Sequence, residues 1–529
     1  MRALLVINAT LDLAREREIA AGAYPRKDYY ELRDALGANI LDLAALDRRR
    51  WTRLARRVAG PALAQALLAW SMSRDYDAVF ADQESTGFAL AALYKLPFFR
   101  GRRPSDLRSH EGISPLTLPT SPFAPPAPSG GAWGDASPQT PAKKTLWWMM
   151  ERVLVRAVAV AKSDGLIARR GAWRGRSNVG AVESLPISRS DGARDVRMAG
   201  VWGEASPQAP PEGAGGGRRG TLEGAGGDGG SSSPAYRERG AGEGHPRLTM
   251  IGHLLSPRGK QALFRGLRLR ATIDAVVVHS SLQARLAART LGLRPDQVEL
   301  VPYQTDERFW APRDAPVEQR ICSAGLEYRD YSTMIQAVAD LPVAVVIAAA
   351  SPWSTFTFEG DERALPAHIR VDSFDYAGLR DLYASSLFVV VPLRDVENQA
   401  GITTILEAMA MGKAVVVSHT RGQTDVIRDR RSQSRAFPER SSQPDWAQQL
   451  GATADTARGH TGIYVQPGDS DELRRAIVYL LEHPEQARAM GANGRRVIEE
   501  TMGLDLFTRR MAAVIAGEPP AAAATEEGL

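Results

Sequence analysis

The stretch VVVPLRDVENQAGITTILEAMAMGKAVVVS, residues 389–418, contains two short β-branched runs on either side of a segment whose apolar residues recur at helical spacing. This pattern predicts a buried strand over 388–391, a helix over 402–411 that ends at Gly412, and a second buried strand over 414–418. A strand-helix-strand unit of this kind is typical of a parallel α/β sheet.

The loop that precedes this helix is predicted to bind a ligand. In open parallel sheets ligands bind beyond the carboxyl ends of the strands, where helix N-termini present unpaired N–H groups. Gly401 lets a ligand approach the backbone, and the N–H groups of Ile402, Thr403 and Thr404 are expected to hold a phosphate. Glu407, further along the helix, is a suitable acceptor for two vicinal hydroxyls. Phosphate and diol together suggest a nucleotide sugar.

Short apolar runs alternate with helical stretches in both halves of the chain. In the first half we expect strands over 3–7, 38–41 and 78–81, and helices over 28–36, 50–73 and 86–96. The alternation predicts two Rossmann-like α/β domains that face a cleft. The expected boundaries are 1–104 plus 246–312 for the N-terminal domain, 313–500 for the C-terminal domain, and 501–516 for a helix that returns to the N-terminal domain.

Residues 105–245 interrupt the first domain with a composition rich in Gly, Pro, Ser and Arg. Such a composition cannot bury enough apolar surface to offset chain entropy, so we expect a low-complexity, mostly disordered insert in a surface loop. GAWGDASPQTP and GVWGEASPQAP form an imperfect duplication inside it. Residues 145–168 are apolar enough for a transient helix, and residues 517–529 are expected to form a disordered tail.

Composition excludes several classes of protein. Cys322 is the only cysteine among 529 residues, which excludes an internal disulfide and a cysteine-built metal cluster. A net charge of +5 is too small to predict nucleic-acid binding. No apolar run approaches the length that spans a bilayer, so we expect a cytoplasmic protein. The arginines between 48 and 57 form either a solvated helix face or a patch that meets anionic lipid of a membrane surface or an anionic acceptor.

Several motifs occur in an order that resembles a known family. They are GHLLS, VVVHSSLQ, VELVPYQTDERFWAP, CSAGLEYRDYSTMIQAV, the stretch quoted first, and TGIYVQPGDSDELRRAIVYLLEHPEQARAMGANGRRVIEE. Together they resemble the retaining, nucleotide-sugar-dependent glycosyltransferases of family 4, also called group 1, which have the GT-B fold. The resemblance implies transfer of a sugar from a nucleoside-diphosphate sugar to an acceptor hydroxyl with retention of configuration. It implies no cofactor beyond this co-substrate, and the acceptor, a glycan, lipid or small molecule, would bind the N-terminal domain.

The signature of that family is a pair of glutamates separated by seven residues. Its second member corresponds to Glu407, which the resemblance implies binds the ribose hydroxyls of the donor. The first position falls on Gln399, and the nearest carboxylate is Glu397. We expect Gln399 to bind a sugar hydroxyl as a neutral ligand, with Glu397 as a partial substitute near the reaction centre. The alternative is that Glu397 is merely solvated.

Other family positions are matched by different residue types. Arg329 aligns with the lysine that neutralises the donor diphosphate, whereas the arginine usual just after Gly325 is Leu326 here. A surface salt bridge with Asp330 or Glu327 is the competing explanation for Arg329. His253 aligns with a histidine beside the transferred sugar, although a lone histidine is more often structural.

Helix capping competes with a functional role for Asp425 and is the better explanation for Asp469 and Asp471. Asp425 lies where the family has a glycine followed by an acidic residue, and Asp469 and Asp471 precede a predicted helix. We therefore expect no metal requirement. Because the first-glutamate and arginine positions are altered, a non-catalytic protein that binds a nucleotide sugar or a glycan on the same fold is the alternative hypothesis.

Overall fold

The computed structural model describes residues 1–96, 245–350, 365–428 and 459–518. The expected insert up to residue 244 and residues 519–529 of the expected C-terminal tail therefore lie outside the described residues. Within the described part no helix is long and apolar enough to cross a membrane.

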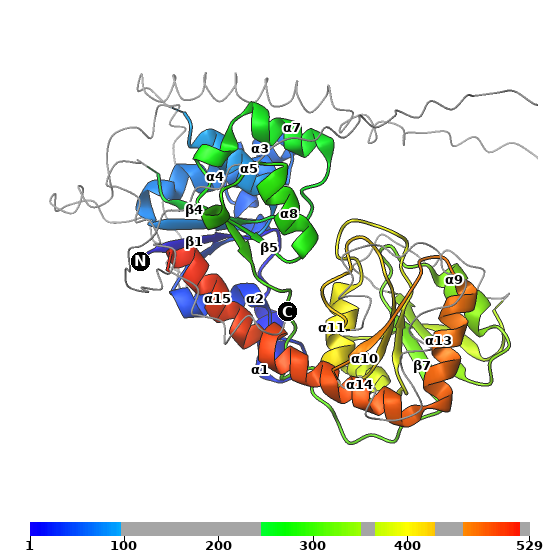
Figure 1. Ribbon diagram of the computed structural model, residues 1–529. Helices are drawn as coiled ribbons and strands as arrows, with labels where there is room; N and C mark the ends of the chain where they lie inside the picture. Colours follow the sequence, from blue (N-terminus) through cyan, green and yellow to red (C-terminus); the bar gives the residue numbers. More distant parts are fainter. Residues whose placement is uncertain (97–244, 351–364, 429–458, 519–529) are drawn as a thin grey trace, which may run out of the picture. The chain divides into compact units, whose positions relative to one another are not determined.

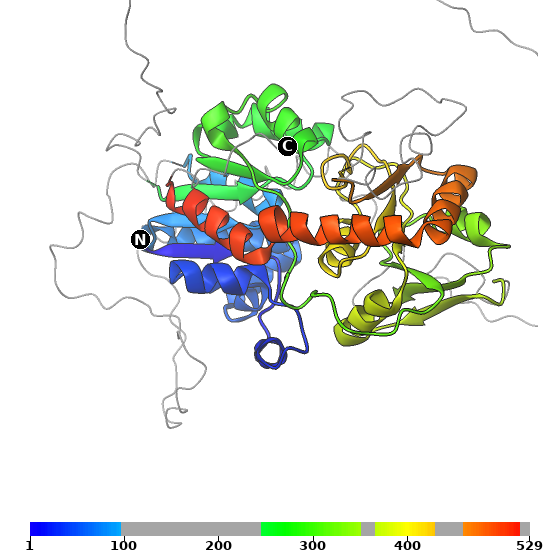
Figure 2. The same ribbon diagram turned by 60° about the horizontal axis from the view of Figure 1, so that its bottom comes forward.

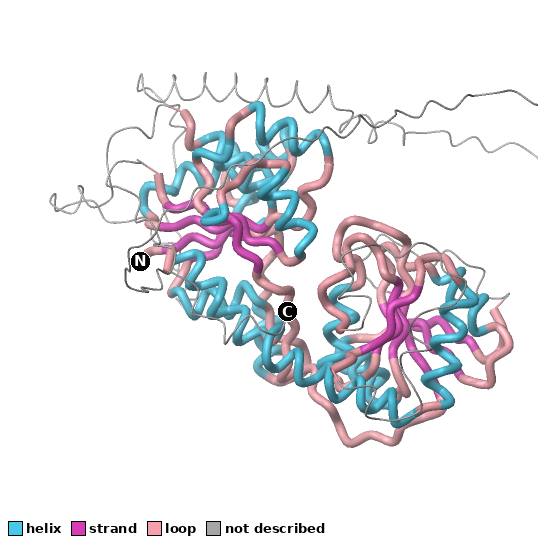
Figure 3. The backbone as a smooth tube through the Cα atoms, viewed as in Figure 1, coloured by secondary structure: helices cyan, strands magenta, loops and turns pink. Residues whose placement is uncertain are grey.

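Six parallel strands form the first sheet, and nearly every side chain of its central strands is buried. Buried apolar runs are what a parallel sheet covered on both faces requires. Figures 1 and 3 show helices on both faces: α4 (Pro61–Met72), α5 (Glu84–Leu93) and α7 (Arg258–Gly266) cover one face, and α2 (Asp28–Leu36) and α15 (Leu504–Ala516) lie side by side on the other. The strand order is β2 (Asn39–Leu41), β1 (Ala3–Val6), β3 (Ala78–Ala81), β4 (Arg247–Ile251), β5 (Ala275–Val278), β6 (Val298–Leu300).

Three of the four helices predicted above for this domain form close to the expected ranges. The helices of this domain are α1 (Leu13–Ala20), α2 (Asp28–Leu36), α3 (Arg50–Ala59), α4 (Pro61–Met72), α5 (Glu84–Leu93), α7 (Arg258–Gly266), α8 (Ser281–Arg289) and α15 (Leu504–Ala516). The single helix predicted over 50–73 is wrong, because Gly60 has a φ of +84° and Pro61 begins a new helix. Helix α1, whose N–H of Ala14 is capped by Asp12, was not predicted.

The chain leaves and re-enters this sheet at neighbouring points. Strands β3 and β4, which flank the predicted insert, pair directly in parallel with Ala78 opposite Arg247. The rings of Tyr94 and His245 stack with centroids 4.9 Å apart. The two ends of the intervening segment are therefore held together by the described residues.

A second sheet of six parallel strands confirms the predicted fold class, two Rossmann-like α/β sheets as in the GT-B fold. One face packs on α10 (Tyr376–Ser385) and α11 (Ile402–Ala410), and the other packs on α9 (Tyr331–Val338) and α13 (Ser470–Glu482). The order is β12 (Gly462–Val465), β11 (Val415–Ser418), β10 (Val389–Val391), β7 (Arg320–Ala324), β8 (Ala344–Ala350), β9 (Ile369–Ser373). The domain boundaries given above stay a prediction.

Strand order places a switch point in each sheet. In the second sheet the chain builds β7, β8 and β9 outward in one direction, and then β10, β11 and β12 outward in the other. The reversal lies between β7 and β10, and in the first sheet it lies between β1 and β3. Ligands of open α/β sheets bind beyond the carboxyl ends of the strands at such points.

Two segments connect the two sheets, and they hydrogen-bond to each other. Figure 2 shows α14 (Pro484–Val497, orange) followed by α15 (red), with a π-helical turn over Ile498–Met502 between them. The other connection runs from β6 to β7. Its Thr305 N–H donates to the carbonyl of Met502 at 3.1 Å, and the Leu504 N–H donates to the carbonyl of Thr305 at 3.0 Å.

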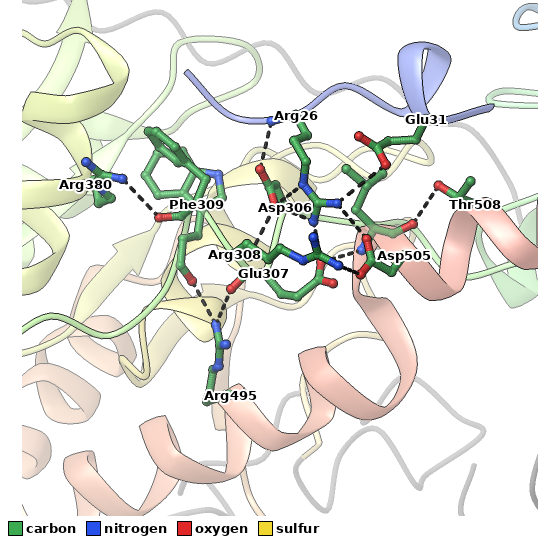
Figure 4. A network of polar contacts seen from close by, with 12 residues as sticks. Arg26, Glu31, Asp306, Glu307, Arg308, Phe309, Arg380, Arg495, Asp505 and Thr508 are labelled. Atoms are coloured by element: carbon green, nitrogen blue, oxygen red, sulfur yellow. Dashed lines mark hydrogen bonds and ion pairs between the residues drawn. The ribbon is translucent and has the colours of Figure 1, made fainter. Parts of the chain in front are cut away.

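A buried ion network fixes these connections to α2 (Figure 4). The guanidinium of Arg26 donates to Asp306 through Nε and Nη2 at 2.9 and 2.8 Å, and to Asp505 through Nη1 at 2.6 Å. The Arg26 side chain is only 15% exposed and that of Asp306 only 3%. Arg308, in contrast, pairs with Asp505 from a side chain that is 68% exposed. Arg26 is therefore the central cation of this network.

Candidate functional site

Arg329 lies at the switch point of the second sheet. It follows the loop that leaves β7, and its backbone forms an isolated bridge with Leu393, just after β10. The residue is 7% exposed. Its guanidinium donates from Nε to the Ala324 carbonyl at 2.9 Å, from Nη1 to the Glu327 carbonyl at 3.0 Å, and from Nη2 to Thr404 Oγ1 at 3.0 Å. The side chain is thus held against the first turn of α11.

Every one of these partners is neutral. Across the described ranges no carboxylate forms an ion pair with Arg329, so the salt bridge considered with Asp330 or Glu327 is not formed. Burial lowers the pKa of the Arg329 guanidinium. A buried charge without a counterion costs free energy unless a ligand supplies one. Glu407 and Glu327 act on the guanidinium of Arg329 only through space, and neither forms an ion pair with it in the described part of the chain.

Two glycines make room for this guanidinium. Gly325 has a φ of +93°, and a Cβ there would collide with Nη2 of Arg329. Gly401 has a φ of +76°, and a Cβ there would lie 2.9 Å from Cγ1 of Val391 and 3.3 Å from Nη1 of Arg329. Both positions require a left-handed backbone as well as close approach, which explains why glycine occupies them.

The N-terminus of α11 lies beside Arg329. Gly401 is its N-cap and provides no side-chain cap, which leaves the first N–H groups of the helix to other partners. The N–H of Ile402 already donates to the carbonyl of Gln399 at 3.2 Å. The side chain of Thr404 is buried under Arg329, and Thr403 is exposed. Of the three N–H groups predicted to hold a phosphate, those of Thr403 and Thr404 therefore remain as candidates.

Glu407 lies one turn further along α11 and is half-buried. Its carboxylate accepts a hydrogen bond from the hydroxyl of Tyr383 on α10 at 3.1 Å. Burial raises the pKa of Glu407 to about 7, and the Tyr383 hydrogen bond, Lys27 and Arg329 oppose this rise. Sequence reasoning missed Tyr383, because nothing in the α10 sequence distinguishes a tyrosine that orients a carboxylate from a core tyrosine.

Glu407 should make the stability of the protein depend on pH. Its pKa is raised in the folded state, so the folded protein binds more protons than the unfolded chain between about pH 4.5 and pH 7. The contribution of Glu407 to the free energy of unfolding therefore falls as pH rises through this window, by on the order of 1–2 kcal/mol. From pH 5 to pH 7.5, the free energy of unfolding measured with urea should fall less for Glu407→Gln than for the parent. An equal fall in both proteins would contradict a raised pKa of Glu407.

The two candidates for the first-glutamate position differ in their surroundings. The carboxylate of Glu397 pairs with Nη1 of Arg421 at 2.8 Å, while Nε of Arg421 contacts Asp395 at 3.2 Å. Both carboxylates are well exposed. No hydrogen bond of the Gln399 side chain occurs within the described part of the chain. Glu397 is thus engaged in a surface ion pair, whereas no ion pair or hydrogen bond holds the side chain of Gln399 in the ranges that the structure describes.

His253 follows β4 at the carboxyl end of the first sheet. Its backbone N–H donates to Glu84 at 3.2 Å, and its ring Nε2 lies 3.0 Å from the carbonyl of Asp82. Glu84 also forms an ion pair with Lys260. These contacts fix the loop and the ring of His253, whose proximity to a transferred sugar stays a prediction.

Capping accounts for Asp469, as predicted, but the prediction for Asp471 is wrong, because Asp471 lies within the first turn of α13 and does not precede it. Asp469 is the N-cap of α13 and accepts from the N–H of Glu472 at 2.8 Å. Asp425 caps a helix distant in sequence: it accepts from the N–H and the hydroxyl of Ser281, at the start of α8, at 2.6 and 2.8 Å. In the ranges that the structure describes, no group of three or more His, Cys, Asp or Glu residues could hold a metal ion.

Comparison with known proteins agrees with the motifs. Residues 331–455, which include Glu407 and begin just after Arg329, match the family model described as group 1 glycosyl transferases, and this confirms the resemblance to group 1. A curated relative, the MMP α-(1→4)-mannosyltransferase of Mycolicibacterium hassiacum, is 24% identical over 241 residues, 43% of this chain. The chain spans about half the length of that relative, 50%.

Among the solved structures that are similar to parts or all of this chain are a protein of Anabaena and one of Thermosynechococcus elongatus. Alr3699/HepE of Anabaena, crystallised with UDP-glucose, has a TM-score of 0.46 and 11% identity over 98% of this chain and 99% of its own. The sucrose-phosphate synthase of Thermosynechococcus elongatus has a TM-score of 0.38 and 20% identity over 51% of this chain and 68% of its own.

Proposed function

We propose that this protein is a glycosyltransferase that moves a hexose from a nucleoside-diphosphate sugar to an acceptor hydroxyl, with retention of anomeric configuration and without a metal ion. The observation that carries the proposal is the buried guanidinium of Arg329, which has only neutral partners and lies at the switch point beside the N-terminus of α11. The match of residues 331–455 to group 1 glycosyl transferases supports it.

Arg329 would act on the leaving group. When the bond between the anomeric carbon and the phosphate oxygen breaks, its electron pair stays on the diphosphate, and negative charge grows there. Arg329 and the N–H groups of Thr403 and Thr404 are donors already held in place, so they stabilise this charge without reorganising. A pre-positioned cation and a helix N-terminus take the role that a metal ion has in other transferases.

The remaining candidates bind and orient the substrates. Glu407, held by Tyr383, would accept hydrogen bonds from the ribose hydroxyls of the donor. Gln399 would bind a hydroxyl of the transferred sugar, and His253 would lie near the same sugar. With retention, the acceptor oxygen approaches from the side that the diphosphate leaves, so its proton passes to the departing phosphate oxygen as the new bond forms.

The test is a panel of UDP-, GDP- and ADP-linked hexoses offered to the purified full chain, with and without EDTA. We expect one donor to be hydrolysed slowly, or transferred in the presence of neutral sugars, at a rate that EDTA leaves unchanged. Tight donor binding by calorimetry without turnover would instead favour the non-catalytic alternative. If no donor is bound and none is turned over, both the transferase proposal and the non-catalytic alternative are refuted.

Helix α3 supports the proposed peripheral contact with an anionic membrane. Its exposed surface combines arginines with two apolar side chains one turn apart, Leu54 and Val58, which are 62% and 54% exposed. Apolar anchors among arginines are typical of helices that lie in a lipid interface.

We expect the protein to float with vesicles that contain phosphatidylserine and not with neutral phosphatidylcholine vesicles. Replacing Leu54 and Val58 by serine should reduce the bound fraction several-fold, because the apolar part of the binding energy is lost. Arg370→Ser, at an exposed position of β9, is the control. Equal binding by the double variant and the parent would argue that α3 is only a solvated face.

A further inference from the structure

Gln423 is a fully buried polar side chain in the loop that follows β11, and the proposed mechanism does not use it. Its Nε2 donates to the backbone carbonyl of Ala400 at 2.8 Å. Ala400 directly precedes Gly401, the N-cap of α11. An amide from one loop therefore holds the backbone at the point where the helix with Thr403 and Thr404 begins.

The amide of Gln423 is only half satisfied. A carbonyl oxygen can only accept, so the contact with Ala400 fixes Nε2 as the atom that faces it. Oε1 then has no hydrogen-bond partner within the described ranges, although it is buried. A buried acceptor without a donor costs free energy, and an apolar side chain of similar volume would avoid this cost. Core packing therefore does not account for a glutamine here, whereas its bond to Ala400 does.

That bond competes with an earlier start of α11. If the helix began one residue earlier, the carbonyl of Ala400 would accept the N–H of Thr404, four residues on. Gln423 engages this carbonyl instead, and the first backbone bond of the helix runs from the N–H of Ile405 to the carbonyl of Gly401 at 3.1 Å. The N–H of Thr404 has no partner in the part of the chain that the structure describes.

The carbonyl one residue earlier is also engaged outside the helix. The carbonyl of Gln399 accepts from the N–H of Ile402 at 3.2 Å and not from the N–H of Thr403. The N–H groups of Thr403 and Thr404, at the start of a helix of 9 residues, are thus left for a ligand. The helix dipole favours an anion at this position.

Gln423 reaches Ala400 from a loop that is itself fixed. The N–H of Gly422 donates to the carbonyl of Val396 at 2.9 Å, and a Cβ at Gly422 would collide with the carbonyl oxygen of Asn398. The loop after β11 therefore packs, backbone against backbone, on the loop after β10. Glycine at the position before Gln423 permits this close approach.

We propose that Gln423 is a positioning residue of the diphosphate site: by holding the carbonyl of Ala400, it keeps the N–H groups of Thr403 and Thr404 free for the phosphate oxygens. The inference rests on the proposed function and adds a residue to it. Without the amide, the carbonyl of Ala400 competes with the phosphate for the N–H of Thr404. Ligands that carry a diphosphate should therefore lose affinity, whereas a nucleoside, whose ribose would bind Glu407 one turn further along α11, should not.

The test uses the full chain and three variants. Gln423→Met has a similar volume and removes both polar atoms of the amide. Gln423→Asn keeps the amide but is one methylene shorter, so that it does not reach Ala400. Thr420→Val is the matched control, because Thr420 lies in the same loop, is fully buried, and has a hydroxyl without a partner among the described residues.

The probes are the diphosphates and the free nucleosides of uridine, guanosine and adenosine. Binding of the diphosphates is measured by calorimetry, and that of the nucleosides by NMR titration. We expect Gln423→Met and Gln423→Asn each to raise the Kd of the bound nucleoside diphosphate about tenfold, the effect of one lost hydrogen bond to a charged ligand. The Kd of the matching nucleoside should change less than about twofold, and Thr420→Val should match the parent with both ligands.

A purely structural role predicts a different pattern. If Gln423 only supports the fold, Gln423→Met lowers the melting temperature and weakens diphosphate and nucleoside by the same factor, and this result would overturn the proposal. We expect the melting temperature of Gln423→Met to stay within a few degrees of the parent, because the variant also removes the buried Oε1. If Gln423→Met does not fold, the ratio of the two Kd values for Gln423→Asn decides.

Failure of the proposed function would be recognised separately, with inorganic pyrophosphate as the probe. If the parent binds pyrophosphate but no nucleotide, and Gln423→Met binds pyrophosphate about tenfold more weakly, the transferase proposal fails while the role of Gln423 stands. If the parent transfers a sugar and the variants bind its nucleoside diphosphate as tightly as the parent does, the role of Gln423 fails alone. A parent that binds neither nucleotides nor pyrophosphate overturns both.

Discussion

Arg329→Ala is expected to slow sugar transfer by about 10²–10³-fold, the loss typical when one fixed donor to a developing oxyanion is removed. Transfer from the active nucleotide sugar, measured as release of nucleoside diphosphate, is the assay. Arg329→Lys should recover part of the rate, because lysine restores the charge without the bidentate fork. Arg313→Ala, a well-exposed arginine paired with Asp381, is the control and should retain the parent rate.

The same substitution should not destabilise the fold. Arg329 is buried with only neutral partners, so its removal relieves the cost of an uncompensated charge while it deletes three hydrogen bonds. We expect a melting temperature within a few degrees of the parent, and a higher one for Arg329→Met, which refills the space with apolar atoms. A variant that transfers sugar at the parent rate, or one that is grossly unstable, would show that Arg329 supports the fold and not the diphosphate.

Arg26→Ala is expected to lower the free energy of unfolding by about 2–4 kcal/mol. The substitution leaves the carboxylate of Asp306, whose side chain is 3% exposed, without its main cation, and it removes the link from α2 to Asp505 at the start of α15. Chemical denaturation followed by circular dichroism is the measurement.

Arg308→Ala is the matched comparison for this prediction. It removes an arginine from the same carboxylate, Asp505, but at a side chain that is 68% exposed, where an ion pair contributes less than about 1 kcal/mol. If Arg26→Ala and Arg308→Ala lower the free energy of unfolding equally, burial does not determine how much each ion pair of this network contributes.

The stretch over 389–418 could be predicted because its signals are local. Residues 389–391 and 415–418 are short β-branched runs that form β10 and β11, and the positive φ of Gly401 marks the start of α11. Sequence also selected Arg329, through the resemblance and not through its surroundings. The lack of a carboxylate partner of Arg329, on which the proposed role rests, depends on packing and could not be predicted from the sequence.

Features that depend on distant segments were missed or misplaced. The pairing of Glu397 with Arg421 joins two loops, and Tyr383 meets Glu407 across two helices. Gln423 was not selected at all, since its partner Ala400 lies in another loop, 23 residues away in sequence. The break at Gly60 had a local signal, the Gly-Pro pair, but the apolar periodicity on both sides favoured one long helix.

The stacked rings of Tyr94 and His245 have a consequence for how this chain can vary. Strand β4 takes its register from β3, residue against residue, and the two ends of the intervening segment meet in ring contact. The entropic cost of closing a loop between fixed ends grows only with the logarithm of its length. The paired strands therefore set no tight limit on the length of the segment between these two rings, since each added residue raises the cost of closing it only slightly.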